Sequence, residues 1–146
     1  MRLGLDAHLL QLFGSIAPKT IMPEPASSWY RRAMGELRTP APARLTVALL
    51  GRDFDGVEGK LVARFGPILR ASDDWPFHFT DYYEKEMGRD LRRKLLAFDR
   101  WIDPGELPAI KRWTNTLEGP PPRAVNLAPG YVTLSKLVLA STKDFA

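Results

Sequence analysis

The spacing of apolar residues changes repeatedly along the second two thirds of the chain, and this change constrains the fold more than any other feature. Residues 44–51 (RLTVALLG) form a short β-branched and apolar run between a proline and a glycine, which predicts a buried strand. Residues 54–65 have helical spacing and end at the sequence FGP; the predicted inner face contains Val57, Leu61, Val62 and Phe65. The folded part therefore opens with a strand and a helix.

Two further strands are predicted next. The first starts near Ile68 and continues through DDWPFHF, where Pro76 indicates an edge strand or a bulge. The second covers residues 92–103, and its side chains alternate between two faces. One face carries Leu96, Phe98 and Ile102, and the other carries Leu95, Ala97 and Trp101.

A second helix and a last strand complete the pattern. Asp103 is placed to cap the helix, Pro104 takes its first position, and Glu106 has the spacing of a capping box. The predicted inward stripe is Leu107, Ile110, Thr114 and Leu117. Residues 123–145 then predict a strand, a turn at the Pro-Gly pair 129–130, and an apolar element whose type the pattern leaves open.

The order strand, helix, strand, strand, helix, strand predicts an α+β fold, a ferredoxin-like βαββαβ sandwich. Its sheet is expected to be antiparallel or mixed, with two helices on one face. We expect one domain over residues 43–146, preceded by a poorly ordered, proline-rich extension over residues 1–42. Within the extension, helical spacing predicts a short amphipathic helix through Leu5, Leu9, Leu12, Phe13 and Ile16.

Composition excludes several classes of protein. The 146 residues include no cysteine, so disulfides, thiolate catalysis and cysteine-bound metal sites are excluded. This usage is compatible with the reducing cytoplasm, which is the expected location. No apolar stretch approaches the roughly 18–20 residues of a membrane span, so no membrane insertion is predicted.

The net charge of +4 is spread along the chain. Residues 1–43 carry five Lys/Arg against three Asp/Glu, and residues 44–146 carry sixteen against fourteen. Even the basic cluster at residues 89–94 has acids close by, which is typical of a solvated charged face. The sequence therefore argues against a nucleic-acid partner.

Phosphate and metal motifs are incomplete. Gly51 and Gly56 have the glycine spacing of a P-loop, but Lys60 comes three positions late and Leu61 replaces the hydroxyl residue that binds magnesium. His8 and His78 are the only histidines and have no metal-ligand spacing. No metal site and no cofactor are assigned.

The stretch FHFTDYYEKEMG, residues 77–88, combines two tyrosines with acids and bases. If extended, it places Asp81, Tyr83 and Lys85 on one face; if helical after Thr80, it has that threonine as its cap. In either case we expect one tyrosine to pack and the other to present its hydroxyl. The cluster is suited to acid–base chemistry or to a structural ion-pair network, and the sequence leaves both open.

Four unusual strings follow one another along the chain: MGELRTPAPARLTVALLG, FHFTDYYEKEMG, IDPGELPAIKRWTNTLE and RAVNLAPGYVTLSKLVLASTKDF. Together they resemble a bacterial family, the domain of unknown function 4416, over residues 34–145. The resemblance implies no defined activity, and it makes Met34 a plausible native start. The family has Asp where this chain has Ala128, and it continues beyond the position of Asp144 into further strands.

The family-like strings concentrate polar residues at strand ends and turns, where function tends to reside. We therefore expect a site for an anionic small molecule, such as a nucleotide. Its predicted residues are Asp81, Tyr83, Lys85, Arg123, Asn126, Tyr131, Lys143 and Asp144. Arg123 and Lys143 are expected to hold the anion, Asn126 and Tyr131 to orient it, and Asp81 to act as base or metal ligand.

The alternative is a non-catalytic interaction or structural module, and whether the protein is an enzyme is left open. Because the resembling family continues past this chain's last residue, we expect residues 131–142 to form an exposed edge. That segment has β-branched residues and a single lysine, Lys136, so self-association through it is predicted.

Overall fold

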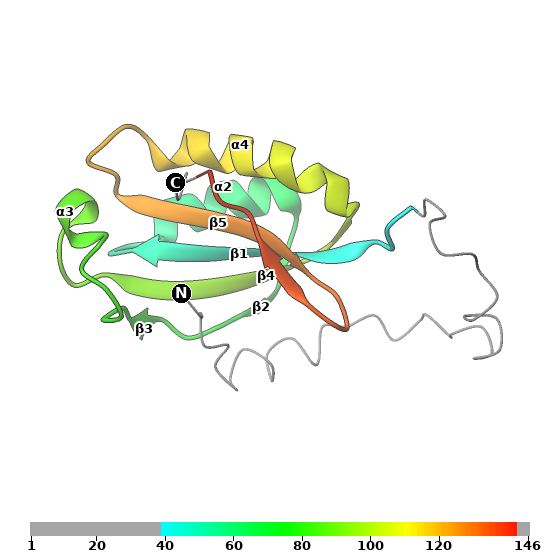
Figure 1. Cartoon of the computed structure of the whole chain (residues 1–146), viewed down its shortest axis with the longest axis horizontal. Coiled ribbons are helices and arrows are strands. Elements are labelled where there is room, and N and C mark those ends of the chain that lie inside the picture. Colours follow the sequence, from blue (N-terminus) through cyan, green and yellow to red (C-terminus); the bar gives the residue numbers. More distant parts are fainter. Residues whose placement is uncertain (1–38, 143–146) are drawn as a thin grey trace.

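The computed structural model describes residues 39–142. Residues 1–38 of the extension expected at residues 1–42, including the short amphipathic helix predicted there, lie outside the described residues. The α+β class is confirmed by the order of the elements (Figure 1). They are β1 (Ala43–Gly51), α2 (Asp55–Phe65), β2 (Ile68–Ala71), β3 (Trp75–Pro76), α3 (Glu84–Met87), β4 (Arg92–Ile102), the 3₁₀ turn η2 (Pro104–Glu106), α4 (Leu107–Glu118), β5 (Val125–Val132) and β6 (Leu137–Leu139).

The strands of the described part form one six-stranded sheet in the order β2-β4-β1-β5-β6, with β3 also pairing with β4. Every pair is antiparallel. The first strand occupies the centre, where Ala48 lies opposite Leu95 of β4 and Ala128 of β5. The β2–β3 side and β6 form the two edges.

Helices α2 and α4 pack on one face of this sheet and form the main core with it. Alternate residues of β1 face them, and Leu45, Val47 and Leu49 are fully buried there. Phe65 of α2 meets Phe98 of β4 and Trp113 of α4 edge to face, with ring centroids 5.7 and 5.1 Å apart. Within residues 39–142, no helix is long and apolar enough to cross a membrane.

The faces predicted for the long strand are confirmed. Leu96, Phe98 and Ile102 belong to the core beneath the helices, and Leu95 and Ala97 belong to a cluster on the other face. The predicted capping box is also present. The Asp103 side chain accepts from Gly105 N at 2.7 Å, and Glu106 accepts from Asp103 N at 2.9 Å. The box caps the 3₁₀ turn that leads into α4.

The long strand predicted from Ile68 onward is divided. β2 ends at Ala71, and the Ser72 side chain takes the place of a backbone group in the ladder. Its Oγ accepts from Leu95 N at 2.9 Å, while Ser72 N donates to Leu95 O. The chain then bulges before β3, where Pro76 sits at the sheet edge as predicted.

Two local predictions are wrong. Val62 is 38% exposed, because the inner face of α2 follows a four-residue step through Val57, Leu61 and Phe65 and leaves Val62 to one side. The Pro-Gly pair 129–130 lies inside β5 instead of forming a turn. Pro129 uses only its carbonyl, which accepts from Ala140 N at 2.8 Å, and the turn comes later, where Thr133 N donates to Lys136 O.

Candidate functional site

The predicted residues of the 77–88 stretch lie at one end of the sheet, around α3 (Figure 1). A short helix does form, but α3 begins only at Glu84 and its N-cap is Tyr83, so the prediction that Thr80 caps it is wrong. Thr80 Oγ1 instead accepts from Tyr82 N at 3.1 Å. Asp81 and Lys85 are exposed. Tyr83 packs against Leu50, Met87 and Leu91, whereas Tyr82 is 60% exposed. One tyrosine packs and the other is exposed, as expected.

Arg123 is held in ion pairs with two carboxylates. Its Nε and Nη2 donate to Glu86 of α3 at 2.6 and 2.8 Å, and its Nη1 donates to Glu118 at the end of α4. The same Nη1 lies 3.4 Å from Asn126 Oδ1. The structure thus brings together two predicted residues, Arg123 and Asn126, and links them to the α3 segment through Glu86.

The ion-pair network continues into the core. Glu118 Oε1 accepts from Lys111 Nζ at 3.1 Å and from Leu127 N at 2.9 Å, and Lys111 Nζ also donates to Leu127 O at 2.5 Å. The side chains of Lys111 and Glu118 are only 7% and 4% exposed. The hydrogen bond to Glu86 raises the pKa of Arg123 above its usual value, and the charge of Glu118 adds to the effect. Two acids and two bases therefore tie α3, α4 and β5 together.

Tyr131 is not brought to this network. It lies five positions beyond Asn126 on β5, about 17 Å at the usual rise of 3.4 Å per residue. An odd separation also places the two side chains on opposite faces of the sheet, and Tyr131 packs against the core beneath the helices. Lys143 and Asp144 lie outside the described residues.

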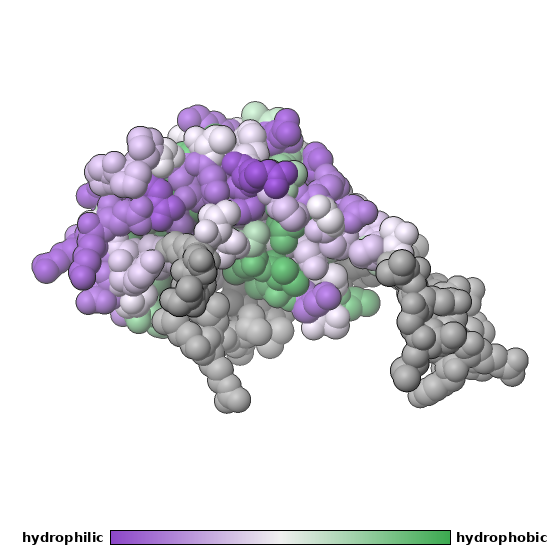
Figure 2. All heavy atoms as spheres, turned by 45° about the horizontal axis from the view of Figure 1, so that its top comes forward, coloured by the Kyte–Doolittle hydropathy of each residue, from purple (hydrophilic) through white to green (hydrophobic). Residues whose placement is uncertain are grey.

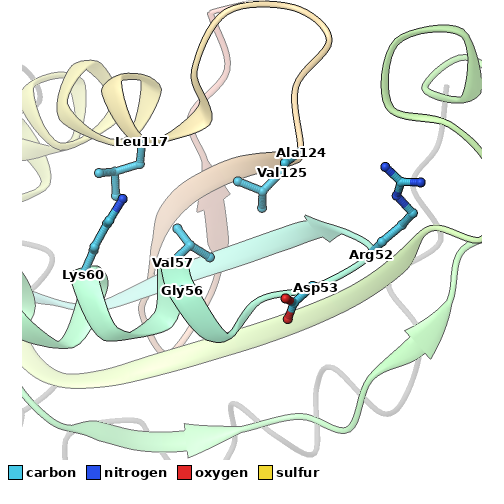
Figure 3. A pocket seen from close by; sticks show the side chains of 8 residues that line it. All are labelled: Arg52, Asp53, Gly56, Val57, Lys60, Leu117, Ala124 and Val125. Carbon is cyan, nitrogen blue, oxygen red and sulfur yellow. The ribbon is translucent and has the colours of Figure 1, made fainter.

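A cavity opens beside the network, between the start of α2, the end of α4 and the start of β5. Its volume is about 340 Å³. Arg52 stands at one end and Lys60 at the other, with Val57 and Val125 between them (Figure 3). The full lining is Arg52, Asp53, Gly56, Val57, Lys60, Leu117, Ala124 and Val125. Leu117 and Ala124 are the chain neighbours of Glu118 and Arg123, so the ion-pair network supports this wall.

The cavity has two cations available. Among the described residues, neither Arg52 nor Lys60 makes an ion pair or hydrogen bond, and both are exposed. The acid of the cavity, Asp53, already accepts from Asp55 N at 3.1 Å. The first turn of α2 also begins here without a side-chain cap on its N-cap residue Phe54, and the positive end of a helix favours anions. The arrangement is suited to holding a small anion.

Neither Arg52 nor Lys60 was predicted from the sequence to belong to a binding site. The available signal was the glycine spacing of Gly51 and Gly56, which does mark a turn between a strand and a helix, although the phosphate motif is incomplete. Within residues 39–142, no three His, Asp or Glu side chains gather closely enough to hold a metal ion.

Comparison with known proteins gives a family but no activity. A family model described as "Domain of unknown function (DUF4416)" matches residues 41–146, which is most of the chain. No curated protein and no solved structure matches it.

Proposed function

Because the chain belongs to the DUF4416 family, whose description names no activity, we propose a function from geometry alone: the domain binds a small anionic molecule in the cavity between α2, α4 and β5. Nucleotides are one such class of ligand. The observation that carries the proposal is the pair of cations, Arg52 and Lys60, which line one cavity without a partner among the described residues.

The shape and chemistry of the cavity support this. Its 340 Å³ lies at the lower end of the range of about 300–1,000 Å³ for small-molecule pockets. Apolar side chains of Val57 and Val125 lie between the two cations, and that of Leu117 lies beside Lys60 (Figure 3). A ligand with an anionic group near Arg52 and an uncharged body along these side chains would match the lining. Lys60 would then take a second anionic or polar group.

The residues predicted from the sequence lie in different positions relative to this cavity. Arg123 and Asn126 would support the wall that carries Ala124 and Val125. Arg52 lies beside the end of α3, since a Cβ built on Gly88 would lie 3.7 Å from its Nη1. Asp81, Tyr83 and Lys85 do not line the cavity and stay predictions. Tyr131 does not line this cavity, and Lys143 and Asp144, which lie outside the described residues, stay predictions. No catalytic step is assigned.

Calorimetric titration of the full chain with inorganic phosphate, a nucleoside monophosphate and a nucleoside triphosphate tests the proposal. Charged hydrogen bonds are worth about 1.5–3 kcal/mol each, so Arg52→Gln and Lys60→Gln should each weaken binding roughly 10- to 100-fold. Arg112→Gln is the matched control. Arg112 is an exposed cation on α4 that does not line the cavity.

Two outcomes would contradict the proposal. One is the absence of binding by all three probes at millimolar concentration. The other is an affinity that Arg112→Gln reduces as much as Arg52→Gln does, which would indicate attraction by net charge without a defined site. An equal loss of affinity in Arg52→Gln and Lys60→Gln, with the affinity of Arg112→Gln unchanged, supports the proposal.

The second candidate is an interaction module that pairs through its sheet edge. The observation that favours it is β6, which pairs with β5 on one side only among the described strands. Leu134 and Leu139 nearby are 74% and 42% exposed. Figure 2 shows hydrophobic residues gathered near the middle of the face it presents. A second copy of the chain is the expected partner.

The finer fold and location also belong to the proposal. We infer a ferredoxin-like core, supported by the order β2-β4-β1-β5 and by two connecting helices on one face, to which β3, α3 and β6 are additions. A cytoplasmic setting is supported by the lack of cysteine. A bacterial source is implied by the sequence resemblance.

A further inference from the structure

The two cations of the cavity, Arg52 and Lys60, are placed for two separate anionic groups. Gly56 and Lys60 both line the cavity from α2 and are four residues apart, which is about 6 Å along a helix that rises about 1.5 Å per residue. Arg52 comes before the start of this helix, and Figure 3 shows it at the opposite end of the cavity from Lys60. Each cation is therefore available to an anionic group of its own.

The lining between the cations is apolar. Val57 and Val125 lie there (Figure 3). Among the described residues, the eight that line the cavity include no aromatic side chain, no hydroxyl and no amide. A sugar or a nucleobase would lose hydrogen bonds to water beside these side chains without gaining others, whereas methylene groups gain by leaving water. The ligand body that fits this lining is a short hydrocarbon chain.

Asp53 limits the negative charge that the cavity can accept. It is the chain neighbour of Arg52 and also lines the cavity, so a ligand meets two positive side chains and one negative side chain. A triphosphate carries several negative charges, most of which would find no cation in the cavity, and an unpaired charge is costly to remove from water. A carboxylate carries a single negative charge at neutral pH. One carboxylate at each end would match the two cations.

We propose that the ligand of this cavity is a small dicarboxylate, in which a short apolar chain joins two carboxylates. This inference rests on the proposed function, because it names the class of anion that the same cavity takes. One carboxylate binds Arg52, whose planar guanidinium can donate two parallel hydrogen bonds to it, and the other binds Lys60. The apolar chain lies along Val57 and Val125.

Titration of the full chain with straight-chain dicarboxylates, from succinate to suberate, tests the inference. Binding is followed at neutral pH by NMR signals of the ligand. Each dicarboxylate is compared with the monocarboxylate that has the same number of carbons, because the two differ in one anionic end. Galactarate has the chain length and charge of adipate but carries a hydroxyl on every inner carbon, so this pair tests the apolar lining. Inorganic phosphate tests the proposed function separately.

At least one dicarboxylate should bind roughly 10-fold more tightly than its matched monocarboxylate, as expected for one added hydrogen bond between charged groups. Affinity should pass through a maximum as the chain lengthens, and adipate should bind more tightly than galactarate. Lys60→Gln should abolish the advantage of dicarboxylates over monocarboxylates, whereas Arg112→Gln should leave that advantage unchanged. Lys60 and Arg112 are both exposed, so both variants should fold.

The results separate this inference from the proposed function. Phosphate binding that depends on Arg52, with dicarboxylates that bind no more tightly than monocarboxylates, would overturn the inference and leave the proposed function standing. So would a nucleoside triphosphate that binds more tightly than every dicarboxylate. An advantage of dicarboxylates that Lys60→Gln does not reduce would indicate attraction by net charge and would also overturn it. Absence of binding by phosphate and by every carboxylate would contradict both proposals.

Discussion

Because Gly130 has no side chain, β6 lies closer to β5 than it could with any other residue at this position. A Cβ built at this position would lie 2.1 Å from Val138 O and 2.7 Å from Leu139 Cδ2, distances that no real Cβ tolerates. Gly59 in α2 is the opposite case, since nothing lies within 4 Å of its added Cβ. The two glycines therefore separate a packing requirement from ordinary helix propensity.

Gly130→Ala should accordingly lower the free energy of unfolding by about 1–3 kcal/mol, because β6 has to move away or strain β5. Gly59→Ala should raise it by about 0.5–1 kcal/mol, as expected for an exposed helical glycine. Urea denaturation of both variants measures the two effects. Equal effects of the same sign would show that β6 does not pack on β5 as described.

Charged residues were the hardest to place from the sequence. Lys111 and Glu118 are seven positions apart and read as surface positions of a helix, since these side chains are rarely buried. Their burial depends on Arg123, in the proline-rich loop after α4, and on the backbone of Leu127, in the strand that follows this loop. No local pattern contains that information. For the same reason, the prediction that Arg123 holds a ligand overlooked the two carboxylates that surround it.

At the scale of elements, one ion pair joins a helix to the sheet. Lys94 of β4 donates to Glu58 of α2 at 2.7 Å, and both side chains are 21% exposed. This hydrogen bond raises the pKa of Lys94 above its ordinary value, against the opposing effect of burial. A folded pKa above the unfolded one means that the stabilisation is complete at neutral pH. It is lost as the pH rises above the ordinary lysine value of about 10.4.

We therefore expect the unfolding free energy of the wild type to fall more steeply between about pH 10 and 12 than that of Lys94→Arg, whose guanidinium stays charged. Chemical denaturation across this range measures both proteins, and the difference between them cancels the titration of other groups. Parallel curves would show that the Lys94–Glu58 pair contributes no stability linked to protonation.

Elements were predicted well where their signal is local. The alternation of β4 and the capping box at Asp103 involve residues within one or two turns of chain, and both are present. The Pro-Gly pair 129–130 gave a strong turn signal that proved wrong, because neighbouring strands decided its conformation. Pro129 has no N–H to leave unpaired, and Gly130 makes room for β6. Tertiary contacts overrode the local preference.

At the scale of the whole molecule, self-association through one edge of the sheet can be distinguished from self-association through the other. Leu139 in β6 and Leu69 in β2 are exposed to the same extent, 42% and 43%. If copies pair through β6, Leu139→Lys should shift sedimentation toward the monomer, because charged edges oppose pairing. Leu69→Lys is the matched control and should leave the distribution unchanged.

Sedimentation velocity over a tenfold to hundredfold range of concentration measures this. A wild type that stays monomeric throughout would remove the second candidate function. A shift caused by Leu69→Lys alone would assign pairing to the opposite edge. Because neither leucine is buried, both variants should fold.

The central position of β1 also has a consequence for how the protein is made. Among the described strands, the first to leave the ribosome is β1, which needs neighbours on both sides, β4 and β5, and these are synthesised much later. Until then, a run of mostly buried, apolar residues has two unpaired edges in a growing chain. Long-range strand pairs of this kind form slowly, and the intermediates that precede them are prone to aggregate. Yield in cells should therefore depend on translation speed and on chaperones as much as on the stability of the finished fold.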